Sequence, residues 1–181
     1  MTENRRQEIE NATYRFLEEQ NAVSFPIDVN AIAKKLGFKV ERMDFGDEKI
    51  TGMILVNDNE PIPNVDTQRF IGINAQLNGE RTRFILAHEL GHFKLHKEKN
   101  MPLLAYRCTD ERNETPEEEE AELYARALLM PRRSIEAAAS MYRESDELLN
   151  VYNTMTEFIS RIFKVSEKKA YERLRELALL S

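Results

Sequence analysis

The residues whose type and spacing most clearly point to chemistry are three histidines in the segment FILAHELGHFKLH, at positions 88, 92 and 96. The chain has 181 residues and contains only these three histidines. His88, Glu89 and His92 form the pattern H-E-x-x-H. On an α-helix, residues four apart lie on one face about 6 Å apart along the axis, so two imidazoles can share one metal ion. The glutamate between them can then take a proton from a metal-bound water, as in zinc-dependent peptidases.

The surrounding residues favour a metal site over a chance match on a surface helix. Phe84 and Leu90 are among several apolar residues that should bury this helix, where unpaired histidines would be costly. His96 is excluded as a ligand of the same ion, because eight residues of continuous helix place it about 12 Å from His88. Zinc–nitrogen bonds are only about 2 Å long. We therefore expect His96 to support a ligand or to lie on the surface.

The third ligand must then be a carboxylate or Cys108. The segment TPEEEEAELYARALLMP predicts an acidic helix, and its Glu118 and Glu122 share the face that should pack inward. An explanation without metal also exists, since Thr115 and Glu118 have the spacing of a capping box and acidic residues suit a first helical turn. Residue chemistry alone leaves Glu118 and Glu122 equally favoured.

These groups need a scaffold, and hydrophobic periodicity and turn residues predict one. The predicted elements are helices at residues 7–20, 28–36, 81–96 and 115–130, strands at 38–45, 52–58 and 69–75, and two or three helices after residue 132. Residues 97–115 are predicted to form a long loop that could act as a gate. We expect an α+β fold with a small, mostly antiparallel sheet. Residues 1–131 should form the catalytic domain and residues 132–181 a helical segment packed on it.

Composition limits the class of protein. The apolar content of 41% suits a globular domain, and no run approaches the roughly 18 apolar residues of a membrane span. The net charge of −6 makes nucleic-acid binding by the whole chain unfavourable. The N-terminus is too charged for a secretory signal peptide, and the single cysteine, Cys108, suits a reducing cytoplasm. A cytoplasmic protein without a membrane partner is the expectation.

The segments RTRFILAHELGHFKLH and EEEEAELYARALLMP together resemble the ImmA/IrrE family of small bacterial and phage metallopeptidases. The resemblance extends from about residue 25 to residue 177. It implies a zincin-like fold, a zinc ion, and Glu118 as the third ligand, three residues before the alanine of the second motif. Where the family usually has asparagine after that alanine, this chain has Glu122, which would orient a ligand histidine. The family implies cleavage of a DNA-binding repressor, often one that controls a mobile element or prophage.

The residues also allow two other functions. In the first, the chain is a DNA-binding regulator with a structural metal site, and residues 159–177 form a helix-turn-helix-like pair. Its basic residues are Arg161, Lys164, Lys168, Lys169 and Arg173, and interleaved glutamates dilute their field. In the second, the chain binds a repressor without cutting it, which the presence of Glu89 makes less favourable.

A peptidase site also needs a group that stabilises the oxyanion and a surface that holds the substrate. Tyr106, Tyr124 and Tyr142 are candidates for stabilising the oxyanion. The strand near residues 52–58 could form a sheet edge that holds the substrate as an added strand.

Overall fold

The computed structural model describes residues 1–22, 24–97, 103–109 and 115–180, with only the backbone described for residues 103–108. Its helices are α1 Glu3–Glu19, α2 Val29–Lys35, α3 Gly79–His96, α4 Pro116–Leu129, α5 Arg132–Glu144, α6 Asp146–Val151, α7 Met155–Phe163 and α8 Glu167–Glu176. Its strands are β1 Lys39–Met43, β2 Ile50–Asn57, β3 Arg69–Asn74 and β4 Leu103–Thr109. The α+β class is confirmed. In the described part, four helices follow residue 131, where two or three were predicted.

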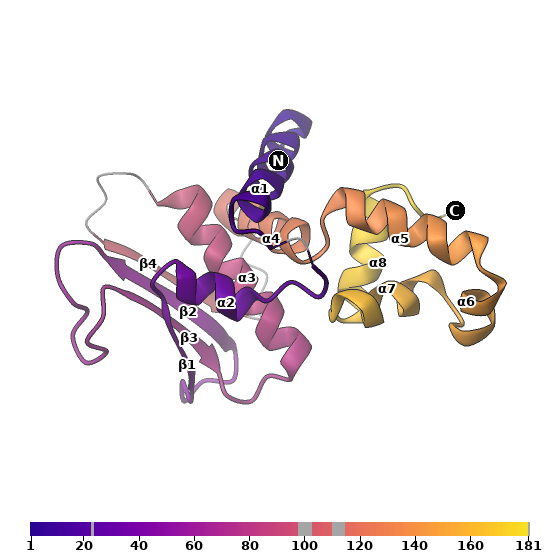
Figure 1. The fold of residues 1–181 in the computed structure, drawn as a ribbon. Coiled ribbons are helices and arrows are strands. Elements are labelled where there is room, and N and C mark those ends of the chain that lie inside the picture. The colour runs from indigo at the N-terminus through magenta and orange to yellow at the C-terminus, as the bar shows by residue number, and fades with distance from the viewer. Residues whose placement is uncertain (23, 98–102, 110–114, 181) are drawn as a thin grey trace.

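The sheet has the strand order β1-β3-β2-β4. β1 pairs in parallel with β3, whereas β2 pairs antiparallel with both β3 and β4. Figure 1 shows this sheet at one end of the molecule and α5 to α8 at the other, with α1 and α4 between them. Helix α3 packs on the sheet through β2, β3 and β4. The sheet therefore supports the helix that carries the H-E-x-x-H motif.

The position of β4 corrects two predictions. Residues 97–115 were predicted to be an irregular loop, but Leu103–Thr109 form a strand. The prediction failed because this short segment becomes a strand by pairing with β2, a contact that its own sequence pattern does not reveal. The same pairing makes β2 an interior strand, so residues 52–58 are not the sheet edge that was expected to receive a substrate.

The local signals at helix ends acted as the sequence predicted. The Asp28 side chain accepts a hydrogen bond from the Ala31 backbone and begins α2, and Gly37 follows its end with a φ of +82°. Lys164 also has a left-handed backbone, with a φ of 53°, and separates α7 from α8. Among the described helices, none combines the length and apolar character that a membrane crossing needs.

A buried arginine joins the C-terminal helices to the rest of the molecule. Arg173 on α8 is 0% exposed and donates through Nη2 to Oε2 of Glu10 on α1, at 2.9 Å. It also donates to the Met130 carbonyl and to Glu176, at 3.0 and 3.1 Å. Burial alone would raise the pKa of Glu176, but Arg126 and Arg173 outweigh it and hold this pKa below its usual value. These contacts hold α8 against α1 and α4. The predicted domain boundary at residue 131 stays a prediction.

We expect Arg173→Met to lower the free energy of unfolding by about 3–5 kcal/mol, because it leaves the Glu10 carboxylate buried without its partner. Urea denaturation at neutral pH measures this loss. The matched control is Arg175→Met on the exposed face of the same helix, which should change stability by no more than about 0.5 kcal/mol. Similar losses in the two variants would show that the buried pair is not important for stability.

Candidate metal centre

Helix α3 presents the first two candidate ligands on its buried face. The Asn78 side chain accepts a hydrogen bond from the Arg81 backbone and caps the helix. From there α3 runs without interruption to His96. His88 and His92 are 3% and 0% exposed, so both imidazoles lie inside the protein. One turn of helix places them together, with their ring centroids 4.8 Å apart.

Helix α4 supplies the third candidate. The Thr115 hydroxyl accepts a hydrogen bond from the Glu118 backbone N–H at 3.3 Å, which is the predicted cap. The Glu118 side chain extends away from the cap and toward the histidines of α3. The Glu118 backbone therefore serves the helix end, whereas its carboxylate, which a capping box would direct back to Thr115, faces the imidazoles.

The donor atoms of His88, His92 and Glu118 converge on one point. Nε2 of His88 lies 3.1 Å from Nε2 of His92 and 3.0 Å from Oε2 of Glu118. Oε1 of Glu118 lies 3.3 Å from Nε2 of His92. Ligand atoms around a tetrahedral zinc ion are separated by about 3.3 Å, given bonds of about 2.0–2.1 Å. The spacing of the three groups suits a single metal ion.

Burial and hydrogen bonds shift the pKa values of His92 and Glu118 in directions that favour cation binding. Burial lowers the pKa of His92, which favours the neutral imidazole that metals bind. Burial would raise the pKa of Glu118, but hydrogen bonds to His88 and His92 outweigh it and hold this pKa at about 2. Glu118 is thus an anion that faces both imidazoles, and the neutral form of His92 is favoured. An anionic carboxylate and a neutral imidazole are the forms in which these two groups bind a metal ion.

Glu89 is buried beside the group, and its carboxylate has no hydrogen-bond partner among the described residues. It is 0% exposed, and neither of its oxygens is paired. Burial raises the pKa of Glu89 to about 8, with His88 opposing the rise and Glu118 adding to it. A buried, unpaired carboxylate is costly unless a cation or a water molecule satisfies it. A metal ion with its water, held by the adjacent residues, would fill that need.

The remaining predicted residues fall into different places. Oε2 of Glu122 lies 3.8 Å from Nδ1 of His88, which is an electrostatic contact longer than a hydrogen bond. Its other oxygen accepts from Lys169 and Arg126. His96 is not part of the converging group, and its ring lies against that of His92. The side chain of Cys108 lies outside the described atoms.

Two of the three tyrosine candidates can be placed. Tyr142 donates a hydrogen bond to the Tyr152 carbonyl among the C-terminal helices, which gives its hydroxyl a structural partner. The Tyr124 hydroxyl is buried and unpaired within the described residues, and burial raises its pKa. The side chain of Tyr106 lies outside the described atoms. The assignment of an oxyanion residue stays a prediction.

Glycines on two sides of α3 let neighbouring elements approach it closely. A Cβ on Gly91 would lie 3.1 Å from the Cα and the carbonyl oxygen of Ala121 on α4. A Cβ on Gly52 would lie 2.6 Å from Cγ2 of Ile85 and 2.8 Å from Oε1 of Glu89. A side chain at Gly52 would displace the side chains of Ile85 or Glu89, and one at Gly91 would press on the backbone of Ala121. The sequence pattern did not single out either glycine for this role.

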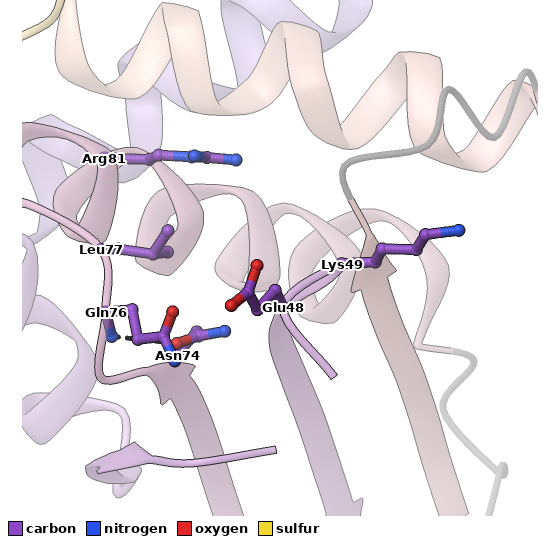
Figure 2. Close-up of a pocket in the computed structure, with 6 residues that line it drawn as sticks. All are labelled: Glu48, Lys49, Asn74, Gln76, Leu77 and Arg81. Atoms are coloured by element: carbon purple, nitrogen blue, oxygen red, sulfur yellow. Dashed lines mark hydrogen bonds between the residues drawn. The ribbon is translucent and has the colours of Figure 1, made fainter. Parts of the chain in front are cut away.

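A separate hollow lies where the sheet meets the start of α3 (Figure 2). It encloses about 370 Å³ and is lined by Glu48, Lys49, Asn74, Gln76, Leu77 and Arg81. None of the converging residues lines it. The Asn74 side chain holds the adjoining backbone by donating to the Ile50 carbonyl and accepting from the Gln76 N–H.

The fold and the His–His–Glu group define a zincin-like α+β protein with a possible metal site. Residues 33–175 match the model of the peptidase M78 family, described as the IrrE N-terminal-like domain. The chain therefore belongs to this metallopeptidase-type family, which confirms the resemblance found in its sequence. A comparison with curated proteins gave no match.

We expect Gly91→Ala to weaken metal binding although it leaves every candidate ligand in place. The new methyl group would meet the backbone of Ala121, which can move only if α4 shifts and carries Glu118 away from the histidines. Overpacking of this kind costs about 1–3 kcal/mol of stability. Zinc titration against a chromogenic chelator, beside thermal unfolding, measures both effects.

Gly79→Ala is the matched control for this substitution. It lies at the start of the same helix, and an added Cβ there would meet no atom within 4 Å. Its zinc affinity should equal that of the wild type. Equal affinity in Gly91→Ala would mean that the close crossing of α3 and α4 does not position the site.

Proposed function

We propose that this chain is a zinc-dependent endopeptidase of regulatory type that hydrolyses a peptide bond in a cytoplasmic protein, a helix-turn-helix repressor. The observation that carries the proposal is the convergence of His88, His92 and Glu118 beside the buried carboxylate of Glu89. Membership of the M78 family supports the peptidase class. The repressor as substrate is supported by the resemblance to ImmA/IrrE proteins.

Each residue has a distinct task in this proposal. His88, His92 and Glu118 hold the metal, and zinc would supply a Lewis acid that polarises the scissile carbonyl and acidifies water. Glu89 would accept a proton from the water that attacks the peptide bond and deliver it to the leaving amine. Its buried position keeps its pKa near neutrality, so one carboxyl can serve in both directions. Glu122 supports His88 electrostatically from α4.

The position of β4 at the sheet edge suits the binding of a substrate in an extended conformation. In the described part of the chain, β4 is an edge strand, because only β2 pairs with it. It also contacts α3, the helix that carries the motif. A substrate segment could add to this edge as a further strand, with its backbone groups paired to β4.

The alternative of a DNA-binding regulator finds less support. Of the basic residues on α7 and α8, Arg173 is fully buried against Glu10, and Lys169 pairs with Glu122 and Glu172. Arg161, Lys164, Lys168 and Arg175 are exposed. Four exposed cations on an acidic protein make a weak field for phosphates. A structural metal site would moreover be closed by four protein ligands, whereas three converge among the described residues.

Zinc content tests the metal part of the proposal. We expect about one zinc ion per wild-type chain by elemental analysis, and a large loss in Glu118→Ala, because two imidazoles alone bind zinc weakly. Glu122→Ala is the control and should keep most of its zinc, since its carboxylate does not reach the converging point. Retention in Glu118→Ala with loss in Glu122→Ala would assign the third ligand to Glu122.

Glu89→Gln tests catalysis separately from metal binding. The amide cannot take up a proton, so the variant should keep its zinc and lose peptidase activity by at least about a hundredfold. New protein N-termini, mapped by mass spectrometry after incubation with lysate, should form with the wild type and not with Glu89→Gln. A repressor among the cleaved proteins supports the proposed substrate. Zinc-loaded wild type that forms no new N-termini, with the intact repressor still bound, would favour the non-catalytic binder.

A further inference from the structure

The third histidine, His96, belongs to a series of polar contacts that begins at the metal group. Nδ1 of His92 lies 3.1 Å from Nδ1 of His96. Nε2 of His96 lies 3.2 Å from Oε2 of Glu120. The carboxylate of Glu120 in turn receives two hydrogen bonds from Arg5, from Nε to Oε1 at 2.7 Å and from Nη2 to Oε2 at 2.6 Å. Four side chains from α3, α4 and α1 thus connect the candidate ligand to the N-terminal helix.

The positions of the protons in this series of contacts follow from the two residues at its ends, Arg5 and His92. The Arg5 guanidinium only donates, so Glu120 is a carboxylate that accepts from it and from His96. His96 then carries its proton on Nε2, which leaves Nδ1 as an acceptor. His92 donates from Nδ1 to that acceptor, and its Nε2 keeps a lone pair directed at the converging point. One arrangement of protons satisfies each of these three contacts, and it leaves His92 in the tautomer that metal binding through Nε2 requires.

The other candidate histidine contacts a different carboxylate. Among the described residues, Nδ1 of His88 lies 3.8 Å from Oε2 of Glu122, and the other oxygen of Glu122 is engaged by Lys169 and Arg126. His92 is the more deeply enclosed of the two rings. The contacts that run through His96 and Glu120 therefore reach the metal group at His92.

Arg5 occupies its place because α1 packs along α4. The Thr2 side chain caps α1 by accepting from the Arg5 backbone, which sets the position of Arg5 in the first turn. The Arg5 side chain is partly exposed, at 39%, whereas those of Glu120 and His96 are 16% and 9% exposed. Arg5 also precedes the residues that match the family model, which begin at residue 33.

We propose that His96, Glu120 and Arg5 are positioning residues that hold His92 in the tautomer and orientation needed to bind the metal ion. This inference rests on the proposed function, because it takes the converging group to be a metal site. The N-terminal helix is then part of the metal centre and not only a cover for α4. Hydrogen-bonded partners of ligand histidines typically contribute about 10- to 100-fold in metal affinity.

Zinc affinity of purified full-length variants tests the proposal, with competition against a chromogenic chelator as the readout. His96→Phe keeps an aromatic ring but removes the acceptor, and should bind zinc about 10- to 100-fold more weakly. Glu120→Ala should show a similar loss, and Arg5→Met a smaller one that Arg5→Lys partly restores. Glu117→Ala is the control, because it removes an exposed carboxylate from the same turn of α4 and should match the wild type.

A second measurement separates positioning from general destabilisation. The chain has only three histidines, so two-bond ¹H–¹⁵N correlation spectra of the imidazoles report each tautomer directly. The wild type should show His92 protonated at Nδ1 and His96 at Nε2, and Glu120→Ala should lose this pattern while the protein stays folded by circular dichroism. Unchanged zinc affinity in folded His96→Phe and Glu120→Ala would overturn this inference alone. A wild type that binds no zinc would overturn both the inference and the proposed function.

Discussion

The site depends on the close approach of α3 to its neighbours on two sides. At Gly91 the backbone of α3 meets that of α4 at Ala121, and at Gly52 strand β2 meets α3 near Glu89. The first contact lets Glu118 reach both imidazoles, and the second lets Glu89 lie against the sheet. Donor atoms 3.0–3.3 Å apart tolerate little displacement if they are to share one ion. Close packing at two glycines therefore sets the geometry on which the chemistry depends.

The buried charged groups around Arg173 are paired, whereas the buried carboxyl group of Glu89 is not, within the part of the chain that the structure describes. Around Arg173, each charge meets an opposite charge or a carbonyl, and the result is a closed set of contacts that joins α8 to α1 and α4. Around Glu89, a carboxylate is buried with no partner among the described residues. Loss of one partner from a closed network leaves a buried charge uncompensated, whereas an unpaired buried acid is a candidate position for a bound ligand.

Segments far apart in the chain meet at α4. Arg5 from α1 pairs with Glu120, and Lys169 from α8 pairs with Glu122. Helix α4 thus carries one candidate ligand on the side that faces α3 and holds both ends of the chain through neighbouring glutamates. Within the run of four glutamates that made this segment ambiguous in the sequence, Glu118 faces the imidazoles and Glu120 pairs with Arg5, whereas Glu117 is exposed.

The sequence by itself determined what local spacing can encode. The four-residue interval of His88 and His92 required a shared helical face, and Asp28 and Thr115 marked helix starts where the structure has them. The segment Leu103–Thr109 escaped prediction because its strand exists through pairing with β2. Residue chemistry could not separate Glu118 from Glu122, since both lie on the inward face. The rotation of α4 against α3 decided that Glu118 is the one that reaches both imidazoles. The tertiary structure alone brought Arg5 and His96 to the same Glu120 carboxylate, because neither side chain carries a local signal for a contact between helices so distant in the chain.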